Sequence, residues 1–220
     1  MGSRLGGVSV KHRVLWIVLA LAWYGTALSA ETPQEVLEKV KRRYDAINDA
    51  ELKFAQVTKY EVSKLEQRVT GTLFIKKQNK YRVEYSDRIV VTDGKTVWSY
   101  NPHQRQVLID HFKVDPNVVT PEKILAAAPK EYYASIVGTE NIGSATTRVL
   151  KLLPKDSHAF VRTMKLWVDE TTWLIKKVEL TDDDGKQTIY TVADIKVNTG
   201  IPDSHFTYTI PEGVEAIDLR

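Results

Sequence analysis

The chain of 220 residues contains no cysteine. Disulfide bonds, thiolate metal sites and cysteine nucleophiles are therefore excluded together. The acylated cysteine that anchors a bacterial lipoprotein to its membrane is excluded for the same reason. Neither covalent cross-links nor thiol chemistry contributes to the function of this protein.

Catalytic and phosphate-binding motifs are missing as well. The sequence has no Gly-x-Ser-x-Gly nucleophile motif, no glycine-rich phosphate loop and no dinucleotide-binding fingerprint. Paired carboxylates of a hydrolase stay open, because their separation depends on the fold rather than on sequence spacing. The sequence therefore predicts that the protein is not an enzyme and needs no cofactor.

Histidine is scarce and scattered. His103, His111, His158 and His205 lie in or beside expected turns, and His12 lies near the N-terminus. None has the HExxH or HxH spacing that brings two ligands to one metal ion. We interpret each as a solvated loop residue and predict no metal site.

Long apolar runs are absent except at the N-terminus. Three basic residues precede about fifteen mainly apolar ones, 14–28, and small residues follow. A membrane-spanning helix needs about twenty apolar residues, so we interpret residues 1–30 as a signal peptide that is cleaved near Ser29 or Ala30. An uncleaved signal anchor is the alternative. Residues 31–220 are expected to form a single mature domain.

An excess of positive charge is also missing once this signal is removed. Three of the 31 Lys and Arg residues lie within it, which leaves 28 basic residues to balance 28 acidic ones. A basic surface that binds nucleic acid or anionic lipid is therefore not indicated.

The sequence that remains begins with an expected helix. From Thr32 to Ile47, apolar residues recur every three or four positions, which is typical of an amphipathic helix. Thr32, Pro33 and Glu35 form the start signal known as a capping box. Two further helices are expected at 121–127, with Thr120 as N-cap, and at 130–136.

The remainder predicts short strands that alternate with turns rich in Asn, Asp and Gly. The expected strands are 52–62, 67–76, 80–85, 89–92, 96–100, 106–110, 146–153, 159–169, 174–181, 187–197 and 206–210. Connections this short join antiparallel neighbours. Residues 182–185, Asp-Asp-Asp-Gly, are expected to form a hairpin turn, because they lack the later ligands of a calcium loop. About eleven strands and three helices predict an incomplete, half-open antiparallel β-barrel covered by a lid of helices.

Four segments carry a family resemblance. Residues 52–56 contain a Phe-x-Gln pattern, and residues 71–76 contain Gly-x-Leu-x-hydrophobic-Lys. The longest match is 91–102, Val-Thr-Asp-Gly-Lys-Thr-Val-Trp-Ser-Tyr-Asn-Pro. Near the C-terminus, residues 206–214 form the pattern Phe-x-Tyr-x-x-Pro-x-Gly-Val. In order and spacing these segments resemble the LolA family of periplasmic lipoprotein carriers.

The resemblance implies a monomeric, non-enzymatic carrier in the periplasm. It takes the acyl chains of lipoproteins from a LolCDE-type ABC transporter at the inner membrane and passes them to a LolB-type receptor at the outer membrane. The expected acyl-chain cavity is lined by Phe54, Tyr81, Val83, Tyr85, Val90 and Trp98. Their alternating positions are also typical of an ordinary half-buried sheet, so the pattern alone does not demonstrate a cavity.

One position departs from the family. Its Lys-Arg-Pro at a strand end is Lys76-Lys77-Gln78 here. The resemblance implies that the Arg holds the lid through hydrogen bonds to helix backbone. Lys77 can donate but lacks the planar fork of arginine, and a plain solvated lysine is the alternative.

A second function stays open beside the lipoprotein carrier. In this alternative, the chain is a LolA-like periplasmic protein with the same half-barrel that binds or senses a different amphiphile.

Overall fold

In the computed structural model, the residues described are Gly2, 31–113 and 121–220, and residues Glu31–Arg220 form one compact unit. The expected signal peptide and the expected cap at Thr120 lie outside the described residues. Helix α1 is Pro33–Asp45 and helix α2 is Pro121–Glu131. Neither helix is long and apolar enough to cross a membrane, in a search confined to the described residues.

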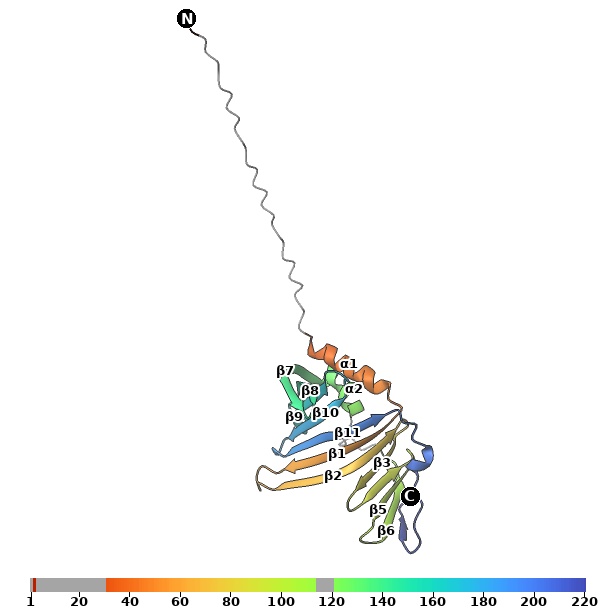
Figure 1. Ribbon diagram of the computed structural model, residues 1–220. Coiled ribbons are helices and arrows are strands. Elements are labelled where there is room, and N and C mark those ends of the chain that lie inside the picture. The colour runs from red at the N-terminus through yellow and green to blue at the C-terminus, as the bar shows by residue number, and fades with distance from the viewer. Residues whose placement is uncertain (1, 3–30, 114–120) are drawn as a thin grey trace. The chain divides into compact units, whose positions relative to one another are not determined.

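Twelve strands form one open sheet that does not close (Figure 1). Their order across the sheet is β12-β6-β5-β4-β3-β2-β1-β11-β10-β9-β8-β7. The strands are β1 Asp49–Lys59, β2 Glu66–Lys76, β3 Lys80–Tyr85, β4 Ile89–Thr92, β5 Thr96–Asn101, β6 Gln106–His111, β7 Tyr132–Ile142, β8 Ala145–Pro154, β9 Val161–Asp169, β10 Ile175–Asp182, β11 Gln187–Val197 and β12 Glu215–Asp218. The expected class, an open and mainly antiparallel sheet with few helices, is confirmed. Strand β12 pairs parallel to β6, which is an exception to the antiparallel prediction.

Local sequence signals explain where several elements begin and turn. The Thr32 hydroxyl accepts a hydrogen bond from the Glu35 backbone N–H at 3.2 Å, and the Glu35 carboxylate accepts one from the Thr32 N–H at 2.7 Å. The predicted capping box is thus confirmed. Gln78 and Asn79 have φ of 71° and 60°, left-handed values that close the three-residue loop 77–79 between the paired Lys76 and Lys80.

The expected hairpin at 182–185 is confirmed. The Asp182 carboxylate accepts hydrogen bonds from the backbone N–H groups of Asp184 and Lys186, and Gly185 has φ of 76°. The acidic run therefore stabilises its own turn.

Two predicted elements are wrong. Most of the helix expected at 130–136 is instead the first half of β7, because Tyr132, Ala134 and Ile136 alternate toward the core while Tyr133 is exposed; only residues 130 and 131 are helical, as the end of α2. The strand expected at 206–210 is not formed. A short 3-10 helix, η1 (Asp203–Phe206), ends at the first of these residues, and 207–210 form neither helix nor strand. Within the described part of the chain there are two α-helices and one 3-10 helix, rather than three helices. Helix α2 also runs past its expected end, with Pro129 inside it.

The C-terminal segment is held to the sheet by a pair of lysines. The Asp203 carboxylate accepts from the Lys76 ammonium at 2.7 Å and from the Lys80 ammonium at 2.8 Å. These hydrogen bonds lower the pKa of Asp203 from its ordinary 3.8 to about 2. His205 in the same turn packs edge-to-face on Phe74, with ring centroids 4.4 Å apart, so the prediction of a solvated loop histidine is wrong at this position.

The hydrogen bonds from Lys76 and Lys80 to Asp203 predict that the stability of the protein depends on pH. The pKa of Asp203 is lower in the folded state than in the unfolded chain. Its contribution to the stability of the fold is therefore fully present above pH 3.8 and is lost as the pH falls through about 2. The difference in free energy of unfolding between the wild type and Asp203→Asn is expected to shrink over that window. Urea unfolding at successive pH values measures it, and a difference that stays constant with pH contradicts the prediction.

Candidate functional site

The strand register divides the sheet into two faces. We call the face on which α1 and α2 pack the inner face, and the opposite one the outer face. Helices α1 and α2 lie against the part of the sheet near β7–β10, while β2–β6 fan out beyond them (Figure 1). The two parts of the inner face therefore have different surroundings.

Beneath the helices, the inner face is filled. Apolar residues of α1 and α2 pack with those of β8, β9 and β10 into one buried cluster. Its members are Val36, Leu37, Val40, Ile124, Leu125, Ala128, Leu150, Leu152, Met164, Leu166, Val168, Ile175 and Leu180. This part is a buried apolar core that joins the helices to the sheet.

Beyond the helices, the inner face stays apolar but is only half-buried. Following the register from β1 through β5, one continuous set of side chains points to this side. Its apolar members are Leu52, Phe54, Val69, Leu73, Ile75, Tyr81, Val83, Tyr85, Val90 and Val97, all half-buried. Tyr190 and Val192 of β11 continue it toward the core. This set is an apolar surface that the described chain does not fully cover.

Charge is segregated between the two faces. On β1–β5 and β11, no Lys, Arg, Asp or Glu lies at an inner-face position, within the strands that the structure describes. The outer face of the same strands carries Glu51, Lys53, Lys59, Glu66, Arg68, Lys76, Lys80, Arg82, Glu84, Asp194 and Lys196. An uncharged, half-buried apolar face suits acyl chains and excludes ions.

Aromatic rings meet near the middle of this face. The rings of Phe54 and Tyr85 pack edge-to-face with centroids 5.9 Å apart, on either side of Gly71 in the register. A Cβ at Gly71 would lie 2.7 Å from the Glu84 carbonyl oxygen and 3.0 Å from the Phe54 ring. Glycine at this position therefore avoids a steric clash with the ring and with the neighbouring strand. Burial raises the pKa of the Tyr81 and Tyr190 hydroxyls.

The register brings together five of the six residues predicted for the cavity. Phe54, Tyr81, Val83, Tyr85 and Val90 lie on the inner face. The sixth, Trp98, points to the outer face. It pairs with Val91, whereas its neighbours Val97 and Ser99 pair with the inner-face residues Thr92 and Val90. The prediction that Trp98 lines the cavity is therefore wrong.

The sequence analysis missed several residues of the same face. Leu52, Leu73, Ile75 and Val97 lie on it between the predicted positions, and Tyr190 joins it from a distant part of the chain. The first four obey the same alternation and could have been found once one residue on each strand was placed. Tyr190 carries no such signal, because the pairing of β11 with β1 is not local.

Lys77 lies beside the end of helix α1. Its ammonium donates to the carbonyl oxygen of Asp45, the last residue of α1, at 3.3 Å, and its backbone N–H donates to the Asn48 carbonyl at 3.1 Å. A cation at a helix C-terminus meets the negative end of the helix dipole. Lys77 thus connects the β2–β3 turn to a helix through helix backbone.

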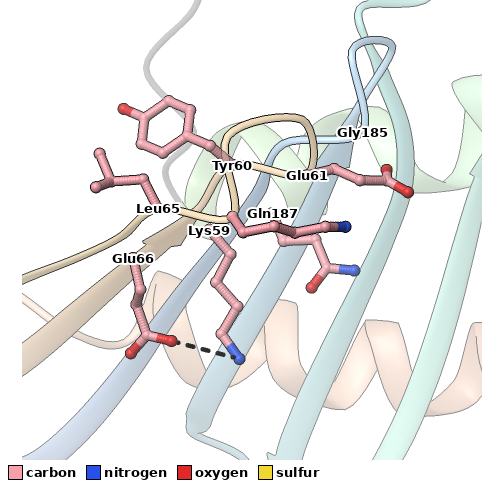
Figure 2. A pocket seen from close by; sticks show the side chains of 8 residues that line it. Lys59, Tyr60, Glu61, Leu65, Glu66, Gly185 and Gln187 are labelled. Atoms are coloured by element: carbon pink, nitrogen blue, oxygen red, sulfur yellow. Dashed lines mark ion pairs between the residues drawn. The ribbon is translucent and has the colours of Figure 1, made fainter.

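A depression of about 340 Å³ lies at the tips of the β1–β2 and β10–β11 hairpins (Figure 2). Lys59 and Glu66, joined by an ion pair at 3.8 Å, line it together with Gln187. All three lie at outer-face positions. The depression is therefore separate from the apolar inner face.

Comparison with known proteins identifies the family of the chain. The family model described as "Outer membrane lipoprotein carrier protein LolA" matches residues 45–209, three quarters of the chain. The chain belongs to the LolA family. The resemblance inferred from the sequence segments is thereby confirmed.

Its LolA-family relatives are distant in sequence. An outer-membrane lipoprotein carrier protein of Glaesserella parasuis is 25% identical over 206 residues, which cover 92% of this chain and 95% of the relative. Another, of Pasteurella multocida, is 24% identical over 196 residues, 88% and 92% of the two chains. Among solved structures, a conserved protein from Thermus thermophilus shares the fold, with a TM-score of 0.55 at 14% identity over 84% of this chain and 98% of its own.

Proposed function

We propose that this LolA-family protein carries lipoproteins by holding their acyl chains on the inner face of β1–β5. The observation that supports this most directly is the uncharged, half-buried apolar surface beyond the helices. The binding residues proposed from the sequence are retained except Trp98: Phe54, Tyr81, Val83, Tyr85 and Val90. Binding of this kind requires no catalytic step.

The energetics explain why such a surface is needed. Each methylene group removed from water contributes about 0.8 kcal/mol, so one sixteen-carbon chain exposed to water costs roughly 12 kcal/mol. Free diffusion of a lipoprotein between two membranes is therefore negligible. A binding face nearly as apolar as the bilayer makes the transfer close to neutral, and a transporter can then supply the direction.

The location and partners follow from the same role. Residues 1–30 are proposed to direct export and then to be removed, which leaves residues 31–220 free in the periplasm. The donor is a LolCDE-type transporter and the acceptor a LolB-type receptor, and the carrier acts as a monomer.

Depletion of the protein tests the role in cells. Outer-membrane lipoproteins are expected to remain at the inner membrane when the protein is absent, as fractionation and immunoblotting would reveal. Mass spectrometry of material that co-purifies with the protein identifies the cargo. Diacylated or triacylated lipoproteins support the proposal, whereas free lipids alone, with normal sorting, would indicate a lipid-binding or lipid-sensing protein instead.

Lys77 is proposed to hold the C-terminal end of helix α1 beside the binding face. Lys77→Met keeps most of the side-chain length but removes the hydrogen bond to the Asp45 carbonyl. The loss of about 1 kcal/mol from that bond is expected to speed release of a bound fluorescent lipopeptide by roughly fivefold in stopped-flow measurements. Lys64→Met, at the tip of the exposed β1–β2 hairpin, is the control. Equal release rates for both variants would exclude this role.

A further inference from the structure

Polarity changes along the inner face of β1. Leu52 and Phe54 are apolar, whereas Gln56 and Thr58, the next two inner-face positions toward the β1–β2 hairpin, are polar and uncharged. Gln67 of β2 and Thr188 of β11 lie directly opposite Thr58. Four neutral polar residues thus gather at the hairpin end of the face.

The other end of the same face is apolar. Ala50 pairs with Ile75, and Ile75 pairs with Tyr81. Ala50 and Ile75 also pack with Ile47, just beyond α1. From Ala50 to Thr58 the strand spans roughly 26 Å. The face is therefore long enough for an extended acyl chain and has a distinct polarity at each end.

Gln56 has hydrogen-bonding capacity to spare. Its side-chain N–H donates to the Thr58 hydroxyl at 3.3 Å. A glutamine amide has two N–H donors and an acceptor oxygen, and the Gln56 oxygen has no hydrogen-bond partner among the described residues. Thr58 beside it is only 8% exposed. The half-buried Gln56 oxygen is therefore available to accept a hydrogen bond from a bound polar group.

We propose that Gln56 and Thr58 bind the polar head of the amphiphile, with its acyl chains running toward Ile75 and Tyr81. The inference rests on the proposed carrier function and adds an orientation and a head site to it. A head made of ester and amide groups fits this site, because it offers neutral acceptors and donors. An anionic phosphate fits poorly, since the lysines and arginines of these strands lie on the outer face.

The head site is tested with a synthetic S-dipalmitoylglyceryl-cysteinyl tetrapeptide. Gln56→Leu is expected to weaken its binding to the purified protein by roughly three- to tenfold, the usual value of one neutral hydrogen bond. Binding of the apolar probe N-phenylnaphthylamine should not change. Gln187→Leu is a matched control, since it places the same change at the same end of the sheet on the outer face. Equal lipopeptide affinity for Gln56→Leu and the wild type would overturn the head site.

The preference for a neutral head is tested with dipalmitoylphosphatidylglycerol. The wild type is expected to bind it at least about tenfold more weakly than the lipopeptide, and Gln56→Lys is expected to narrow that gap by supplying a cation. Equal binding of both ligands by the wild type contradicts a neutral head site.

The orientation is tested with two engineered tryptophans. Tyr81 and Tyr85 lie on the same face of β3, roughly 13 Å apart. A lipopeptide brominated at the ends of its acyl chains is expected to quench Tyr81→Trp more strongly than Tyr85→Trp, and bromines close to the ester groups should reverse the order. The opposite pattern would overturn the orientation while leaving the carrier function intact. Failure of the lipopeptide to bind the wild type at all would instead refute the proposed function.

Discussion

Replacement of Leu73 by arginine is expected to abolish useful binding of acylated cargo. Leu73 lies on the inner face, between Leu52 and Val83 in the register, in the middle of the proposed binding face. An arginine facing acyl chains at the centre of an apolar layer costs about 2–4 kcal/mol. The affinity for a lipopeptide should therefore fall by roughly 30-fold to several hundredfold, as measured by fluorescence titration.

The adjacent residue supplies the control. Thr72 is on the outer face of the same strand, opposite Glu84 on β3 and Lys53 on β1. Thr72→Arg adds the same charge one residue away, where charged side chains already lie. It should leave lipopeptide affinity within about twofold of the wild type. Equal losses in the two variants would show that the effect is one of overall charge, and the inner face would then not be the binding surface.

Truncation of Leu152 is expected to cause the largest loss of stability. Leu152 is 0% exposed and lies on the inner face of β8, in the cluster that joins the sheet to α1 and α2. Removing a buried leucine side chain down to alanine costs about 2–5 kcal/mol, because apolar contacts are lost and a cavity remains. For a domain of this size, such a loss lowers the melting temperature by roughly 6 to 15 °C, which calorimetry measures.

Leu153→Ala is the matched comparison. Leu153 follows directly on β8 but points to the outer face and is 39% exposed. Its truncation should cost less than about 1 kcal/mol. Equal destabilisation by the two variants would mean that the helices do not depend on the inner face for their packing.

Local signals in the sequence predicted most of the elements. The capping box of α1, the Gln78-Asn79 turn and the alternation of Tyr81, Val83 and Tyr85 each depend on residues close together in the chain. Such short-range preferences are visible without any knowledge of distant contacts. The same approach failed at Tyr132, where short apolar runs of helix and strand look alike and packing against α2 and β8 decides.

The sequence by itself excluded thiol chemistry and correctly predicted the open sheet and the family. It also predicts the export signal, which lies outside the described residues. Only the tertiary structure decided which residues share a face. Side chains alternate within every strand, but the register of each pair determines whether odd or even positions point inward. Thr92 pairs with Val97, so the inner positions change from even on β4 to odd on β5, and Val90 lies on the inner face while Trp98 lies on the outer one. The same long-range register, between β1 and β11, brings Thr188 and Tyr190 beside Thr58 and Gln56 and thereby sets the polar end of the binding face.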